Sequence, residues 1–384
     1  MTTVAIFTAL YPPAVKGGGP IRSTEVLAET ASSEITPIVI TNDHDIGEQK
    51  PLSVTTNEWT KRGRAKIRYT SASSLIELIR GCSAVRAERP SLLNFNSFFS
   101  AKFTILPLFL WRVGYWGRPI LLLAPRGEFG HGALCRRSYK KRLYIWLFRL
   151  LGIHRSVVWH STAAHETADI QREWGPRATI ILREEDTLLQ SEPLASRQLP
   201  RQQPYFVFLG RIVEHKGLDV VLKALKGIDS KVSLDIYGPE EDPAYAALCK
   251  ELVAGLPTPV SVEFKGTVAP EAACSTLAAY DALLMPTAGE NFGHVIAESL
   301  SVSCPVFTTP STPWTEILQS GGGIVVKDRE PESWLAAIDR FVALPAPTRA
   351  QLRLEAGNAY RSWKGQPQKP HVWTTALQAG QRRR

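Results

Sequence analysis

The sequence has few cysteines and no long apolar runs. Its five cysteines lie far apart and form no Cys-x-x-Cys pair, which argues against a disulfide framework or a zinc ribbon and favours a reducing compartment. The longest apolar stretches, TILPLFLW and ILLLAP, are shorter than the ~20 residues of a membrane-spanning helix. The start, MTTVAIFTALYPP, lacks the basic segment of a signal peptide. We therefore expect a cytoplasmic protein.

The composition is that of an ordinary globular protein, with 44% hydrophobic and 21% charged residues. A chain of 384 residues is long enough for two domains. Lys and Arg number 45 and Asp and Glu 36, so the net charge of +9 favours an anionic partner such as a nucleotide phosphate, a nucleic acid or an acidic membrane. No zinc-finger, basic-zipper or RNP-like pattern accompanies this charge, so nucleic acid is not expected.

Apolar runs and helical stretches alternate along the chain in two series. The first begins with VAIFTAL (4–10) and a glycine loop, and the second begins with PYFVFLG (204–210). Between them, the segment Thr187–Pro204 is rich in Pro, Gln and Ser, which is typical of a linker. We predict an α/β fold of two Rossmann-like doubly wound domains, 1–190 and 200–359, facing a central cleft where ligands bind.

Two cations stand in the loop after the first strand of the second series. In FLGRIVEHKGLD, Arg211 and Lys216 precede a helical stretch. Fixed positive charge beside the free N–H groups of a helix N-terminus would bind a diphosphate. The alternative is a solvated surface loop.

Two acidic residues follow the strand DALLMP. In PTAGENFGHVIAESL, seven residues separate Glu290 from Glu298, and these carboxylates would accept hydrogen bonds from sugar and ribose hydroxyls. Between them, Asn291, Phe292 and Gly293 offer backbone N–H groups to a phosphate or a leaving oxygen. The alternative is helix capping, because acidic residues favour a first turn.

Two motifs in the first domain are weaker. Glycines in KGGGP (16–20), among them Gly18 and Gly19, let a backbone approach an anion closely, but the order G-x-G-x-x-G of NAD-binding folds is absent. The Asp43-His44-Asp45 sequence invites a metal site, yet its polar loop favours a plain turn. No metal or cofactor is expected.

Three segments together resemble the family 4 glycosyltransferases of the GT-B architecture, and the resemblance runs over nearly the whole chain. They are PP…GGGP…LAE, GRIVEHKGLD and GENFGHVIAESLSVSCPV, in which Glu290 and Glu298 match the Glu-x7-Glu motif of the family. The resemblance implies a hexosyltransferase that uses a nucleotide-sugar donor, retains the anomeric configuration and needs no divalent metal. The cations would instead stabilise the leaving nucleoside diphosphate.

The resemblance also assigns roles to single residues. Arg211 and Lys216 would hold the diphosphate, Glu298 the ribose and Glu290 the donor sugar. The donor pocket would be lined by Asn291, Phe292 and Gly293. Gly18 and Gly19 would approach the phosphate from the opposite domain, and the turn KGTV (265–268) would contact the nucleobase.

The sequence departs from the family in the loop LLLAPRGEFGHGAL. Arg126 and Gly127 stand where many members have a His-Gly pair. We expect Arg126 to line the acceptor cleft, although arginine cannot act as a general base. Either Glu128 or His131 compensates, or the donor phosphate takes the acceptor proton. A second departure is TIILREEDTLL (179–189), whose charged residues 183–186 we interpret as a solvated turn.

The positive charge is concentrated between Phe129 and His165, a segment without Asp or Glu. Basic residues there alternate with aromatic and aliphatic ones, which is typical of a helix that lies on an anionic membrane leaflet. The alternative is that the apolar side packs on its own domain. From the resemblance, a C-terminal helix over 360–384 is expected to cross back onto the first domain.

Our main hypothesis is a retaining glycosyltransferase of surface polysaccharide or lipopolysaccharide biosynthesis. It would act on a glycan or lipid-linked glycan, in the cytoplasm or on the inner face of the cytoplasmic membrane. The alternatives are a sugar-nucleotide epimerase or phosphorylase-like enzyme of the same fold, and a non-catalytic membrane-associated partner of a synthase complex.

Overall fold

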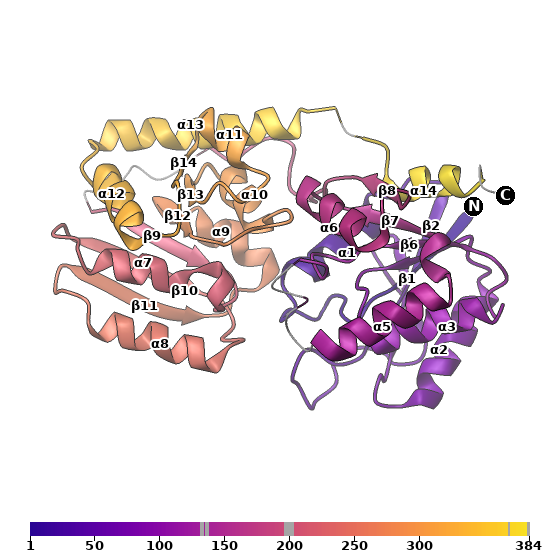
Figure 1. Cartoon of the computed structure of the whole chain (residues 1–384). Helices are drawn as coiled ribbons and strands as arrows, with labels where there is room; N and C mark the ends of the chain where they lie inside the picture. Colours follow the sequence, from indigo (N-terminus) through magenta and orange to yellow (C-terminus); the bar gives the residue numbers. More distant parts are fainter. Residues whose placement is uncertain (131–133, 135–137, 196–202, 368, 382–384) are drawn as a thin grey trace. The chain divides into compact units, whose positions relative to one another are not determined.

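The computed structural model describes residues 1–130, 134, 138–195, 203–367 and 369–381. The chain forms two compact units (Figure 1). The first comprises Met1–Leu188 and Gln368–Arg384, and the second comprises Leu189–Pro367.

The described part of the first unit contains an eight-stranded sheet in the order β3-β4-β2-β1-β5-β6-β7-β8. All neighbours are parallel except the edge strand β3, which runs antiparallel to β4. The strands are β1 (Thr2–Phe7), β2 (Ile35–Asn42), β3 (Trp59–Arg62), β4 (Ala65–Thr70), β5 (Leu92–Phe95), β6 (Ile120–Leu123), β7 (Val157–Ser161) and β8 (Thr179–Leu182).

Helices cover both faces of this sheet. They are α1 (Gly19–Glu29), α2 (Leu75–Ala87), α3 (Leu106–Arg112), α5 (Ser138–Leu150), α6 (Ala164–Trp174) and α14 (Val372–Gln381), with a π-helical turn η1 (Ala101–Ile105) before α3. Alternate residues of β1 enter opposite cores, because side chains alternate along a strand. Ala5 and Phe7 pack with α2, α3, α5 and α6, whereas Val4 and Ile6 pack with α1 and α14.

The described part of the second unit contains a six-stranded parallel sheet in the order β11-β10-β9-β12-β13-β14. The strands are β9 (Tyr205–Leu209), β10 (Val232–Tyr237), β11 (Val260–Gly266), β12 (Ala282–Met285), β13 (Val306–Thr308) and β14 (Gly323–Val325). Helices α7 (Leu218–Leu225), α8 (Pro243–Ala254) and α12 (Pro331–Val342) cover one face. Helices α9 (Ala273–Leu277), α10 (His294–Ser301), α11 (Thr315–Gln319) and α13 (Ala346–Lys364) cover the other. The predicted pair of doubly wound α/β sheets is confirmed.

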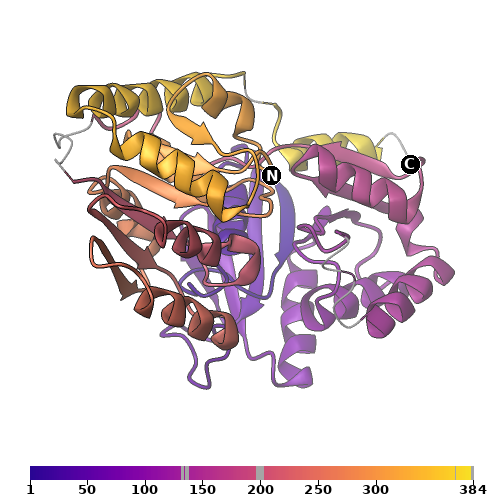
Figure 2. The same ribbon diagram turned by 60° about the vertical axis from the view of Figure 1, so that its left-hand side comes forward.

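The sequence reading missed four strands of the first unit, β3, β4, β7 and β8. Strands β3 and β4 carry charged residues on an exposed side and therefore lack the continuous apolar run of a buried strand. The structure also differs at the C-terminus, where residues 360–364 still belong to α13 of the second unit. Of the last two helices, only α14 belongs to the first unit, and it lies beside β6 and β8 of that unit (Figures 1 and 2).

No helix in the described ranges is both long and apolar enough to cross a bilayer.

The C-terminal helix is anchored by Trp373, which is fully buried and donates its indole N–H to Asn94 Oδ1 at 2.9 Å. We expect Trp373→Ala to lower the stability of the first unit by about 3–5 kcal/mol, since a buried aromatic side chain is lost. Scanning calorimetry should show an earlier transition for the first unit and an unchanged one for the second. The exposed Trp146→Ala is the control. Equal stability of Trp373→Ala and the parent would contradict this packing.

Candidate functional site

In the second unit, two loops at the carboxyl edge of the sheet meet through an ion pair. Lys216 follows β9 and Glu290 follows β12, and these two strands are neighbours in the sheet. Lys216 Nζ lies 2.5 Å from Glu290 Oε1, which also accepts a hydrogen bond from Thr287 Oγ1 at 2.7 Å. The side chains are only 15% and 12% exposed. This arrangement fixes a cation and a carboxylate where doubly wound sheets bind ligands.

Backbone contacts hold these two loops together. The N–H of Ala288 donates to the carbonyl of His215 at 2.7 Å. Gly217 has a φ of 75°, and a Cβ there would lie 2.2 Å from the carbonyl oxygen of Pro286. Only glycine therefore fits beside Lys216.

The second predicted cation, Arg211, has a different partner. It begins the same loop and donates to the carboxylate of Glu241 at 2.8 and 3.1 Å, in an exposed pair. An exposed pair of this kind contributes little to stability, so the guanidinium is able to exchange Glu241 for another anion at small cost.

In the segment before α10, one residue caps the helix through its backbone and another packs its side chain in the core. Gly293 is the N-cap residue, with a φ of 83°. The Phe292 ring is buried against Trp314 and Trp363. Its carbonyl accepts the Trp314 indole N–H at 2.6 Å. Asn291 is half-buried.

Glu298 is buried within α10, in the second turn after Gly293. A buried carboxylate at this place in a helix is not a first-turn cap, so the capping alternative does not account for it.

In the first unit, Asp45 holds the glycine loop. Its Oδ2 accepts the N–H groups of Val15 and Lys16 at 2.8 and 3.2 Å, and Gly18 beyond them has φ 60° and ψ −130°, a region that favours glycine. Asp43 Oδ1 lies 2.6 Å from His44 Nδ1. Both carboxylates thus have local partners, and among the described residues no group of three or more His, Cys, Asp or Glu is placed to hold a metal ion.

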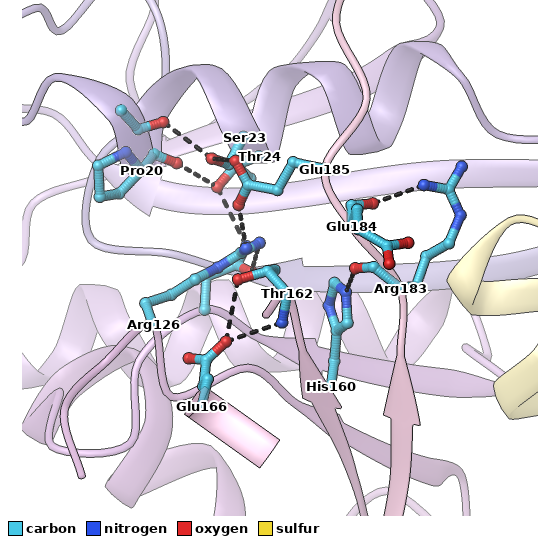
Figure 3. Close-up of polar contacts among 12 residues, drawn as sticks. Pro20, Ser23, Thr24, Arg126, His160, Thr162, Glu166, Arg183, Glu184 and Glu185 are labelled. Carbon is cyan, nitrogen blue, oxygen red and sulfur yellow. Dashed lines mark hydrogen bonds and ion pairs between the residues drawn. The ribbon is translucent and has the colours of Figure 1, made fainter. Parts of the chain in front are cut away.

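Arg126 lies in a buried polar cluster at the carboxyl edge of the first sheet (Figure 3). It has a φ of 53°, unusual for a non-glycine residue. Its guanidinium forms an ion pair with Glu185, with side chains 10% and 9% exposed, and donates to Asn96 Oδ1 at 3.2 Å. The other Glu185 oxygen accepts from Ser23 of α1.

The expected solvated turn at residues 183–186 is therefore wrong for Glu185 and for Arg183, which is also buried. Arg183 donates to the Asp186 carboxylate at 2.8 and 2.9 Å. Four consecutive charged residues are typical of a solvated loop. No local signal in the sequence distinguishes residues 183–186 from such a loop.

Glu166 fixes the backbone next to Arg126. Its Oε1 accepts the Gly127 N–H at 2.7 Å, and its Oε2 accepts the Thr162 N–H at 2.8 Å. The side chain is almost fully buried. Glu166 therefore joins the strained Arg126–Gly127 turn to the start of α6. The sequence reading missed it, because Ala163 is the N-cap residue of α6 and the Ser/Thr-x-x-Glu capping pattern is absent.

Glu128, one of the two residues expected to compensate for the missing histidine, holds a neighbouring loop in place by hydrogen bonds. It accepts hydrogen bonds from Ser97 Oγ at 2.7 Å and from the N–H groups of Phe98 and Phe99. Burial raises the pKa of Glu128, against the effect of these hydrogen bonds. The other candidate, His131, lies outside the described residues.

Two comparisons of sequence each match a part of the chain. Residues 191–359, which lie within the second unit, match the family described as "Glycosyl transferases group 1". The chain is 28% identical over 160 residues to a D-inositol 3-phosphate glycosyltransferase of Streptomyces griseus subsp. griseus. That match covers 38% of this chain and 33% of the relative, so the chain spans about a third of the relative's length.

Similar solved structures extend over the whole chain. One is sucrose-phosphate synthase from Thermosynechococcus elongatus, with a TM-score of 0.71, 16% identity and coverage of 100% of this chain and 98% of that chain. Another is Anabaena Alr3699/HepE in complex with UDP-glucose, with a TM-score of 0.68, 15% identity and coverage of 100% and 99%. The fold is GT-B, with two Rossmann-like units.

The cluster around Arg126 includes a histidine that should make the stability of the first unit depend on pH. His160 Nε2 lies 3.0 Å from the Arg183 carbonyl, and burial, assisted by the Arg126 charge, lowers the pKa of His160 from 6.5 to about 3. Between these values the unfolded chain binds a proton that the folded chain does not. The unfolding free energy should therefore fall as the pH is lowered through this window, by up to ~1.4 kcal/mol per pH unit.

Calorimetry of the first-unit transition from pH 7 to pH 4 measures this slope. His160→Gln keeps an N–H donor for the Arg183 carbonyl and should reduce the dependence of the unfolding free energy on pH. Part of that dependence should remain, because the pKa of His371 is also lowered. An unchanged slope would show that His160 is not the group responsible.

Proposed function

We propose that the chain is a retaining glycosyltransferase that moves a sugar from a nucleoside-diphosphate donor to a hydroxyl of a glycan or lipid-linked glycan. The observation that carries this proposal is the nearly buried Lys216–Glu290 pair at the carboxyl edge of the second sheet. The match of residues 191–359 to group 1 glycosyltransferases and the likeness to a structure holding UDP-glucose support the donor class.

The donor binds to the second unit through complementary groups. Lys216 holds the diphosphate, and Arg211 joins it by exchanging Glu241 for a phosphate oxygen, because a bidentate guanidinium suits either anion. Glu290 accepts hydrogen bonds from the donor sugar and Glu298 from the ribose. The N-terminus of α10, which begins after Gly293, adds a favourable helix dipole.

In the reaction, the bond between the anomeric carbon and the diphosphate oxygen breaks while the acceptor oxygen bonds to that carbon on the same face. Fixed cations stabilise the negative charge that develops on the leaving diphosphate, so no metal is required. The acceptor proton passes to an oxygen of the departing diphosphate. This route agrees with the three hydrogen bonds that already occupy Glu128 and with the inability of Arg126 to act as a base.

Lys216→Ala and Glu290→Gln test the donor site. Each should lower the rate of nucleoside diphosphate release from a panel of UDP-, GDP-, ADP- and dTDP-sugars by ~100-fold or more. Lys216→Ala removes a charge that stabilises the leaving diphosphate, and Glu290→Gln removes the charged acceptor that holds the donor sugar. Lys223→Ala is a matched control, since Lys223 lies on α7 in an exposed pair with Asp219. Parent-like turnover in Lys216→Ala would remove the assignment.

The basic helix α5 supports a role at an anionic membrane, as surface polysaccharide or lipopolysaccharide assembly would require. Ile145 and Phe148 pack in the core, so one side of the helix covers its own unit. The other side exposes an apolar stripe at helical spacing, formed by Tyr139, Leu143, Trp146, Leu147 and Leu150. The exposed Lys140 and Arg142 flank it. Arg136 and Arg137 lie outside the described residues.

An apolar stripe beside lysine and arginine is suited to the headgroup region of an anionic leaflet. The protein should float with vesicles containing phosphatidylglycerol at low salt and dissociate as salt is raised. The double substitution Trp146→Ser and Leu150→Ser should reduce the bound fraction at least ~10-fold. Leu354→Ser, at an exposed apolar position of α13, should not. Equal flotation of the double variant would contradict the assignment of this surface.

A further inference from the structure

A cavity of about 250 Å³ lies within the first unit, at the carboxyl ends of three strands. Ala9 follows β1, Asn96 follows β5 and Arg126 follows β6, and all three line it. Strands β1 and β5 are neighbours at which the chain changes its direction of travel across the sheet. Such a topological switch point is where open α/β sheets bind their ligands. We infer that this cavity binds one uncharged sugar ring of the acceptor, an inference that rests on the proposed function.

The size and walls of the cavity suit a single sugar ring. Its volume is below the ~300–1,000 Å³ of pockets for drug-sized ligands. Phe7, Ile21 and Phe103 contribute apolar surface, and Asn96 and Ser100 contribute polar groups. A pyranose likewise combines apolar and polar surface, because it has an apolar C–H face and a rim of hydroxyls. Apolar walls with a few placed polar groups are the usual means of orienting such a ligand.

The charges around the cavity disfavour a phosphate or carboxylate on the bound ring. Arg126 is the single cation among the lining residues, and its guanidinium is already paired with Glu185. Glu128 adds a carboxylate to the wall. The wall therefore carries one carboxylate and one cation, and the cation is already paired with Glu185, which does not itself line the cavity. Because these side chains are nearly buried, the repulsion of an anion is screened less than it would be at an exposed surface.

Glu185 is the residue that sets this specificity. It occupies the guanidinium that would otherwise bind an anion in a bidentate manner. Ser23 holds its second oxygen, and Asn96 holds the other end of the Arg126 fork. In Glu185→Gln the amide keeps the shape and removes the charge, with its oxygen accepting from Arg126 and its N–H donating to Ser23 Oγ. This variant should thus admit anionic sugars that the parent rejects.

Ligand-observed NMR on the full chain tests the inference with defined probes. The neutral probes are the methyl glycosides of glucose, galactose, mannose and N-acetylglucosamine, and the anionic probes are glucose 6-phosphate and glucuronic acid. At least one neutral glycoside should bind at least 10-fold more tightly than either anion. Glu185→Gln should reduce that preference ~10-fold. Binding of an anion at equal or greater strength by the parent would overturn the inference.

A cavity-filling variant locates the binding. Ala9 is exposed at the cavity wall, so Ala9→Trp fills the space without disturbing the core. It should abolish glycoside binding, whereas Ala87→Trp at the exposed end of α2 should not. Circular dichroism verifies that both variants fold. Unchanged glycoside binding in Ala9→Trp, or binding of no glycoside by the parent, would overturn the inference.

Nucleotide binding separates this inference from the proposed function. A thermal-shift measurement with UDP, GDP, ADP and dTDP reports on the Lys216 site alone. If a nucleoside diphosphate binds but no glycoside does, the cavity assignment fails and the donor site stands. If glycosides bind in the predicted pattern and no nucleotide does, the cavity assignment stands as a sugar site and the transferase proposal fails.

Discussion

Parallel strand pairing is the constraint on which both candidate sites depend. In a parallel sheet the carboxyl ends of neighbouring strands share one edge, so the loops that follow them meet even when they are far apart in the sequence. Strands β9 and β12 are neighbours, and this adjacency brings Lys216 to within 2.5 Å of Glu290. In the first unit the same rule brings the loops after β1, β5 and β6 around one cavity.

The two sites differ in how their charge is arranged. In the second unit Lys216 shares its loop with Arg211, whose partner Glu241 is exposed and exchangeable. In the first unit Arg126 is held by a buried carboxylate and a strained backbone. A buried ion pair of this kind is costly to break, because the partner charge would be left uncompensated. The exposed, exchangeable pair of Arg211 suits an incoming diphosphate, and the buried pair of Arg126 suits a neutral ligand.

Much of the fold could be predicted from the sequence because buried parallel strands are continuous apolar runs. DALLMP and KVSLDIYG correspond to β12 and β10 with small shifts at their ends. Edge strands such as β3 have no such signal, since one side faces water. The spacing around Lys216 and Glu290 also marked the loops that form the ion pair.

Other features of the sites depend on tertiary contacts that one sequence does not reveal. The burial of Glu185 arises from Ser23 and Arg126, which are distant in sequence, and its own neighbourhood has the charge density of a solvated turn. Phe292 sits within a motif that suggests ligand contact, yet its ring completes a cluster with Trp314 and Trp363. In both cases the position of residues far along the chain decides the role.

The central claim is that the second unit binds a nucleoside diphosphate through protein cations alone. Isothermal titration calorimetry of UDP, GDP, ADP and dTDP into the full chain, with a chelator present and at several salt concentrations, tests it most directly. The account predicts saturable binding of at least one of them with the chelator present, weakening as salt rises. Binding of none, or binding only after a divalent metal is added, would contradict it.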